Sequence, residues 1–114
     1  MMQLQPNTAT AACALRLELH DVAEDDTVSG HPKTGSAVLG SIGDVEVGVW
    51  EMTVGGMRDV ESEEFFVVLS GSAVVEFDDG SEPLHLKAGD VARLAAGTRT
   101  VWTVSEPLRK VYLT

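Results

Sequence analysis

The chain has 114 residues, which is enough for one domain with a hydrophobic core. Its formal net charge of −10 argues against binding to nucleic acid or to an anionic membrane surface, because both favour a basic protein face. Cys13 is the only cysteine, so an intrachain disulfide and a thiolate cluster for zinc are excluded. No apolar run approaches a membrane span, and the first residues lack a signal-peptide pattern, so we expect a cytoplasmic protein.

The amino-terminal part is predicted to hold a tail, one strand and a loop. Residues 1–13 are polar or small and are expected to form a flexible tail, with a single domain over residues 14–114. Residues 14–20 alternate apolar and polar side chains, which predicts a short strand. Residues 23–37 combine an acidic run with Gly and Pro, which predicts a loop.

The remaining sequence is all-β in pattern, with no convincing amphipathic helix. Short segments rich in strand-forming residues lie at 44–54, 64–69, 72–77, 83–90, 90–95, 98–104 and 109–114. Turns are predicted at Ser70-Gly71, at the Asp79-Gly80 hairpin and at Ala96-Gly97, and Pro107 is expected to interrupt the last strands. Short strands at this spacing predict a β-sandwich or a β-barrel.

Several of these segments together resemble a known family. EEFFVVLSGSAVVEFDDG, the later AGD and the pattern W-x-V-x-E-P-x-R-K-x-Y resemble the cupins. Within them, GVWEMTVGG and VSGHPKTG are similar to the small single-domain subfamily that also forms the carboxy-terminal half of ureidoglycine aminohydrolase. The resemblance covers about residues 28–114. It implies a double-stranded β-helix, a jelly-roll barrel whose lumen, lined by every second residue, holds the site.

The metal-binding motifs of catalytic cupins are only partly present. Those motifs, G-x5-H-x-H-x3,4-E-x6-G and G-x5-P-x-G-x2-H-x3-N, place three histidines and a glutamate around a divalent metal. Glu64 and Gly71 match the E-x6-G part. The histidine positions hold other residues: Arg58 and Val60 with the shorter spacing, Met57 and Asp59 with the longer one, and Thr100 in the second motif. We therefore expect no cofactor, with a divalent metal ion as the less favoured alternative.

Strand alternation predicts what lines the lumen instead. If Glu64 faces inward, Phe66 and Val68 do so too, and an inward Thr100 brings Trp102 with it. The charge of Glu64 beside such rings would be costly unless an arginine pairs with it. The predicted site has Glu64 as its catalytic candidate, and its ligand-binding candidates are Trp50, Arg58, Phe66, Arg99, Thr100 and Trp102.

Three functions remain open at this point. The favoured one is a metal-free cupin that binds a small, anionic or aromatic metabolite. The second is an enzyme, either of the ureidoglycine aminohydrolase type or a related lyase or isomerase, with Glu64 as general base. The third is a structural or regulatory dimer whose lumen is filled by side chains. Because both faces of EFFVVL are apolar, we expect a homodimer in each case.

Overall fold

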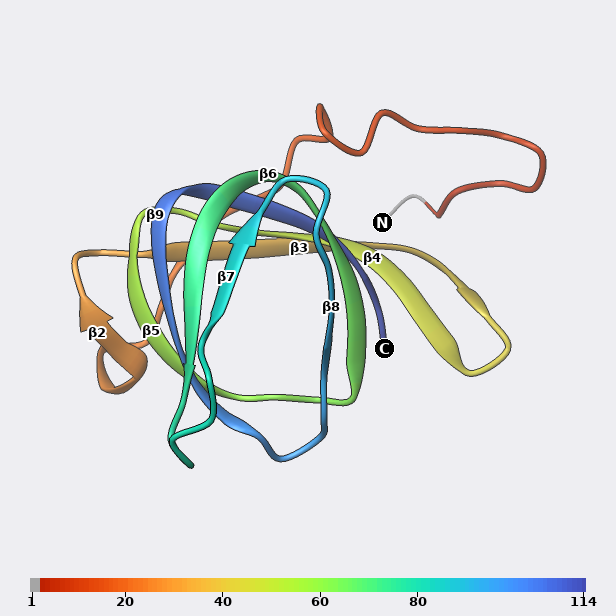
Figure 1. The fold of residues 1–114 in the computed structure, drawn as a ribbon. Coiled ribbons are helices and arrows are strands. Elements are labelled where there is room, and N and C mark those ends of the chain that lie inside the picture. The colour runs from red at the N-terminus through yellow and green to blue at the C-terminus, as the bar shows by residue number, and fades with distance from the viewer. Residues whose placement is uncertain (1–2) are drawn as a thin grey trace.

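A computed structural model describes residues 3–114, and it shows a strongly curled antiparallel sheet. Its elements are β1 (His20–Asp21), the 3-10 helix η1 (Glu24–Asp26), β2 (Thr27–Ser29), β3 (Lys33–Ile42), β4 (Val45–Met52), β5 (Gly55–Val60), β6 (Glu64–Phe77), β7 (Leu84–Lys87), β8 (Val91–Leu94) and β9 (Arg99–Leu113). Figure 1 looks through the interior that these strands surround. The predicted all-β architecture, with strands curled around an interior, is confirmed.

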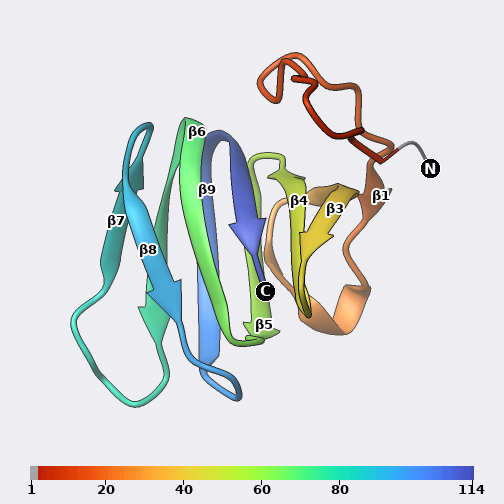
Figure 2. The ribbon, with the colours of Figure 1, turned by 90° about the vertical axis from the view of Figure 1, so that its right-hand side faces the viewer.

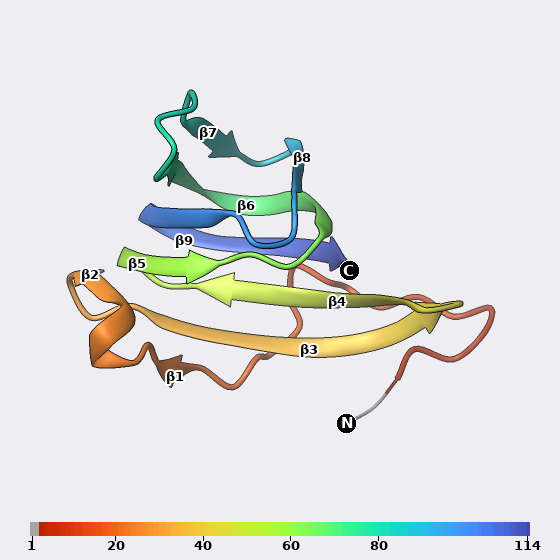
Figure 3. The same ribbon diagram turned by 90° about the horizontal axis from the view of Figure 1, so that it is seen from below.

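Two long strands organise the barrel. One side of β9 pairs with β6 along most of its length, and its other side pairs with β5 and then with β4. The free side of β6 is covered by β8 near its start and by β7 near its middle. Figures 2 and 3 show the consequence: β7 and β8 lie at one end of the row of strands, and β3 and β1 at the other.

The predicted breaks at Gly71 and Pro107 are wrong, because β6 and β9 each continue through them. Gly71 lies opposite Pro107, and a Cβ on Gly71 would sit 2.0 Å from the Pro107 carbonyl oxygen. With φ at +88°, Gly71 lets the strand bend where a side chain would collide. The register shifts between Val68 and Ala73 absorb the missing amide of Pro107. Both long strands therefore turn a corner of the barrel together.

The amino-terminal predictions are also partly wrong. Residues 14–19 form no strand, and β3 begins at Lys33, inside the segment predicted as a loop. The reason is that the Arg109 guanidinium donates hydrogen bonds to the carbonyls of Ala12 and Leu15, at 3.0 and 2.6 Å. These bonds hold the segment against the sheet without making it a strand of the sheet. Residues 3–13 have no helix or strand, and Leu4 donates to the Leu39 carbonyl at the edge of the sheet. The flexibility of residues 1–13 stays a prediction.

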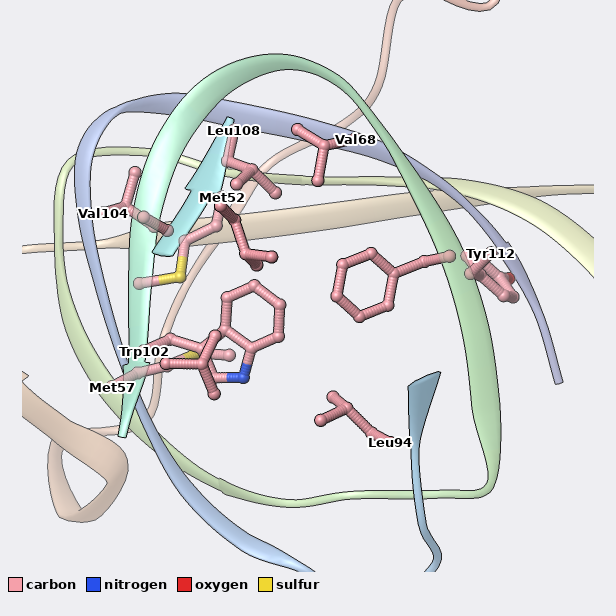
Figure 4. Packing of buried hydrophobic residues seen from close by; sticks show 12 residues of the cluster. Met52, Met57, Val68, Leu94, Trp102, Val104, Leu108 and Tyr112 are labelled. Atoms are coloured by element: carbon pink, nitrogen blue, oxygen red, sulfur yellow. The ribbon is translucent and has the colours of Figure 1, made fainter. Parts of the chain in front are cut away.

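Apolar side chains fill most of the interior (Figure 4). The fully buried ones, each less than 2% exposed, include Phe66, Val68, Trp102 and Leu108. Phe65, the neighbour of Phe66, is 49% exposed, as the alternation predicts. Among residues 3–114, no helix is long and apolar enough to cross a bilayer.

Candidate functional site

The site is built around a lysine buried in the lumen. Lys110 lies on β9 between Leu108 and Tyr112, both of which also face the interior. Its Nζ atom donates to Glu64 Oε1 at 2.6 Å, and the two side chains are only 6% and 12% exposed. A cation does pair with Glu64, and it is a lysine rather than an arginine. A charge-assisted hydrogen bond of this length is among the strong polar contacts in a protein.

Three aromatic rings surround the Lys110 ammonium. Its Nζ lies 4.6 Å from the ring centre of Trp50, 4.3 Å from that of Phe66 and 4.9 Å from that of Trp102. The two indole rings are themselves 5.6 Å apart. Each ring face attracts a cation, and the effect is larger where water is excluded. The sequence did not settle which face of its strand carries Trp50. The structure places the Trp50 side chain on the interior face.

A second carboxylate is buried next to this group. Glu61, in the connection between β5 and β6, is 7% exposed. Its Oε2 accepts hydrogen bonds from Thr100 Oγ1 at 2.5 Å and from Trp102 Nε1 at 2.9 Å. Sequence analysis missed Glu61, because its position depends on the connection rather than on strand alternation. It did select Thr100 and Trp102, the two donors that hold Glu61.

Asp59 and Tyr112 complete the polar part of the lumen. Desolvation, followed by the nearby Glu61 carboxylate, raises the pKa of Asp59, although Asp59 is accessible to solvent. Tyr112 donates to Glu46 Oε2 at 2.8 Å. Desolvation and then this bond raise the pKa of Tyr112 to about 12.

These groups border a cavity of about 180 Å³, which we call the lumen cavity. It is smaller than the 300–1,000 Å³ or so of typical sites for drug-sized ligands. The lumen cavity is lined by Ser36, Trp50, Asp59, Glu61, Ser62, Glu64, Trp102, Lys110, Tyr112 and Thr114. Of the predicted site residues, Glu64, Trp50 and Trp102 border it. Phe66 lies behind Lys110, and Thr100 contributes through Glu61.

Arg58 and Arg99 lie elsewhere. They line a larger hollow of about 640 Å³, which we call the outer groove, and Asp26, Asp59, Glu76, Asp78 and Thr100 also border it. Because Met57, Thr100 and Trp102 are buried, the alternation of β5 and β9 places both arginines on the outer face of the sheet. Arg58 donates to the Asp25 carbonyl at 2.8 Å. The structure therefore places these two side chains outside the lumen, whereas Thr100 borders the outer groove and also donates to Glu61 in the lumen.

The residues of the lumen do not fit a divalent transition metal. The three carboxylates there come without an imidazole, and the Lys110 ammonium already occupies Glu64. Within residues 3–114, no group of three His, Cys, Asp or Glu side chains converges as metal ligands. His20, His31 and His85 are all exposed.

A family model, the EutQ-like cupin domain, matches residues 39–112. The chain belongs to the EutQ-like cupin family. None of the curated proteins compared with this cupin matches it.

Solved structures share its fold. A protein of unknown function from Pseudomonas syringae pv. tomato superposes with a TM-score of 0.76 at 25% identity, over 93% of this chain. This cupin spans only 46% of that protein's length. The EutQ protein of Clostridium difficile gives a TM-score of 0.62 at 16% identity, covering 82% of this chain and 78% of EutQ. A DUF861 family protein from Thermotoga maritima gives 0.53 at 31% identity, covering 56% of this chain and 73% of that one.

Proposed function

We propose that this cupin binds a small polar metabolite in the lumen cavity, with Lys110 as a fixed cation and without a metal. The observation that carries the proposal is the buried Lys110–Glu64 pair at the wall of a cavity. A buried ion pair adds little to stability compared with well-packed apolar side chains. Charged groups that converge on a cavity mark it as a candidate binding site.

Aromatic and polar groups of the lumen would make different contacts with a bound molecule. Trp50 offers a ring face to a bound molecule, and the Lys110 ammonium has N–H donors beyond the one that Glu64 accepts. Glu61 and Glu64 are carboxylates that accept hydrogen bonds. The existence of the lumen cavity favours this function over a dimer whose lumen is filled by side chains.

A ligand screen with matched variants tests the proposal. Small metabolites would be screened by thermal shift against the wild type, Trp50→Leu and Phe65→Leu. Phe65 is the control, because its ring is exposed on the outer face of the sheet. We expect a binder that loses its stabilising effect in Trp50→Leu and keeps it in Phe65→Leu. Binding that survives unchanged in Trp50→Leu, or a stoichiometric transition metal in the purified protein, would contradict the proposal.

An enzyme is the second candidate, in line with the resemblance to ureidoglycine aminohydrolase. The observation in its favour is that two carboxylates, Asp59 and Glu64, border one cavity in different surroundings. Asp59 has a raised pKa, and Glu64 is paired with Lys110. Such a contrast suits an acid and a base in one reaction. Ammonia release from ureidoglycine, lost in Glu64→Gln, would support it, and no release by the wild type would reject this activity.

We also propose a homodimer through the outer face of β6 and β8. Phe65 and Val91 there are 49% and 66% exposed, so the face is apolar. The exposed Glu63–Arg93 pair lies beside it, and a two-fold axis would allow each Glu63 to meet Arg93 of the other copy. Light scattering at micromolar concentration should give a dimer mass for the wild type and a monomer mass for Phe65→Glu. A monomeric wild type would refute the dimer. The cytoplasmic location stays a prediction.

A further inference from the structure

The lumen cavity contains more carboxylates than cations. Asp59, Glu61 and Glu64 border it together with one ammonium, that of Lys110. Lys110 forms its ion pair with Glu64. Among the ion pairs within residues 3–114, none includes Asp59 or Glu61. Two negative side chains at this cavity are thus without a salt-bridge partner.

Of these two carboxylates, Glu61 has the greater need for a cationic partner. It is 7% exposed, and the donors that hold it, Thr100 and Trp102, are neutral. A buried carboxylate needs a nearby cation to offset its desolvation, and hydrogen bonds from neutral groups offset only part of that cost. The Thr100 and Trp102 bonds nevertheless hold Glu61 in one orientation at the cavity wall, so the charge is positioned as well as buried.

Asp59 lies close enough to Glu61 to feel its charge. The Glu61 carboxylate is the second cause, after desolvation, of the raised pKa of Asp59, and the Val60 backbone N–H and then Lys110 act in the opposite direction. The two carboxylates therefore repel each other. A cation between them would relieve this repulsion and the desolvation of both groups.

The remaining wall is aromatic and limits the size of the occupant. Trp50 is half-buried and borders the lumen cavity, so part of its surface is available to a bound molecule. Indole is the ring that binds organic cations best. The cavity of about 180 Å³ admits a molecule of only a few non-hydrogen atoms.

We infer that the lumen cavity takes a small organic cation, such as a protonated amine or an amidinium, whose N–H groups donate to Asp59 and Glu61 while its carbon body contacts Trp50. This inference rests on the proposed function and names the ligand class, and it replaces the anionic ligand expected from the sequence. Lys110 keeps Glu64 neutralised, so the free negative charge of the cavity is that of Asp59 and Glu61.

The two indole N–H groups provide the readout. The chain has two tryptophans, both at this cavity, and Trp102 Nε1 donates directly to Glu61. A ¹⁵N-labelled sample would be titrated with methylammonium and, separately, with acetate at constant ionic strength. We expect saturable shifts of the indole cross-peaks with methylammonium only.

Three variants locate the site. Glu61→Gln keeps an oxygen that can accept from Thr100 and Trp102 but removes the charge. Asp59→Asn removes the charge at an accessible position and keeps an oxygen that can accept from the Val60 N–H. Each should weaken methylammonium binding about tenfold or more, as expected for the loss of a hydrogen bond to a charged group. Glu18→Gln is the matched control, since the Glu18 side chain is 86% exposed and should bind like the wild type.

The outcomes separate this inference from the proposed function. Binding of acetate but not methylammonium would overturn the cationic ligand and leave a small-molecule site in place. Binding of neither probe would count against both. Equal methylammonium binding by the wild type, Glu61→Gln and Asp59→Asn would overturn the placement of the site. If Glu61→Gln does not fold, Asp59→Asn decides the question alone.

Discussion

Two adjacent glutamates at the start of β6 form ion pairs on opposite sides of one sheet. Glu63 pairs with Arg93 at 3.2 Å on the outer face, where both side chains are about 60% exposed (59% and 62%). Glu64 pairs with Lys110 at 2.6 Å in the lumen, where both are nearly buried. Each cation also lies over aromatic rings: Arg93 over Phe65 outside, and Lys110 over three rings inside.

This contrast shows that burial, rather than the kind of contact, determines what these charges do. The outer pair is solvated, so its loss leaves two charges that water can stabilise. The inner pair has little access to water, so each partner depends on the other. For the same reason the smaller lumen cavity is a better site candidate than the larger outer groove, whose charges are on the surface.

The largest expected effect comes from breaking the inner pair. Lys110→Met should lower the free energy of unfolding by about 3–5 kcal/mol, because Glu64 stays buried without a partner. Arg93→Met should lower it by less than about 1 kcal/mol. Urea denaturation of both variants measures the contrast, and equal losses would show that the two pairs do not differ as described.

Removing both inner charges should recover most of this loss. The double variant Glu64→Met/Lys110→Met leaves no unpaired charge and should return to within about 1–2 kcal/mol of the wild type, or exceed it. A double variant as unstable as Lys110→Met would mean that the ion pair itself, rather than an isolated charge, holds this part of the barrel together.

A smaller effect is expected at the hydroxyl that holds Glu61. Thr100→Val keeps the shape of the side chain but removes its hydrogen bond to Glu61, and should cost about 1.5–3 kcal/mol. The matched control is Thr103→Val, whose side chain is exposed on the opposite face of β9. If both variants unfold at the same urea concentration, Glu61 does not depend on Thr100.

Tyr112, the only tyrosine, offers a pH test of the polar part of the lumen. Its pKa is about 12 in the folded protein and 10.0 when unperturbed, so the stability it contributes is present below pH 10 and is lost as pH rises towards 12. Tyrosinate absorbance should therefore titrate near pH 12 in the folded protein. A midpoint near 10 would place Tyr112 in water rather than against Glu46.

The smallest effect is expected from Asp59→Asn. The pKa of Asp59 is raised in the folded state, so its ionised form is destabilising above about pH 4, the range in which the unfolded chain has released this proton. Asn at this position should raise stability at neutral pH by no more than about 1 kcal/mol, because the site is open to solvent. The gain should disappear in acid, and thermal unfolding at the two pH values would show whether it does.

The alternation of the long strands could be predicted from the sequence, and it gave most of the lumen. Glu64, Phe66 and Val68 face inward on β6, as Thr100, Trp102 and Val104 do on β9. Lys110 follows the same alternation with Leu108 and Tyr112. It was missed because Pro107 suggested that the strand ended, whereas the strand bends there.

Other features could not be found by local pattern. Glu61 is buried by the path of a connection, and only the three-dimensional structure brings it to Thr100 and Trp102. β3 contains Gly35, Gly40 and two serines, so its alternation is weak, and its pairing with β4 defines it as a strand. Arg58 and Arg99 have guanidinium groups that could bind a ligand, but both lie on the outer face of the sheet.

The central claim is that the cation of the lumen is the ammonium of Lys110, held by Glu64 among three rings. Nitrogen-15 NMR of lysine ammonium groups tests it directly, because the three lysines include two exposed ones, Lys33 and Lys87. The account predicts one slowly exchanging ammonium signal, shifted by the aromatic rings, that is absent from Lys110→Met. Three fast-exchanging lysines without such a signal would contradict it.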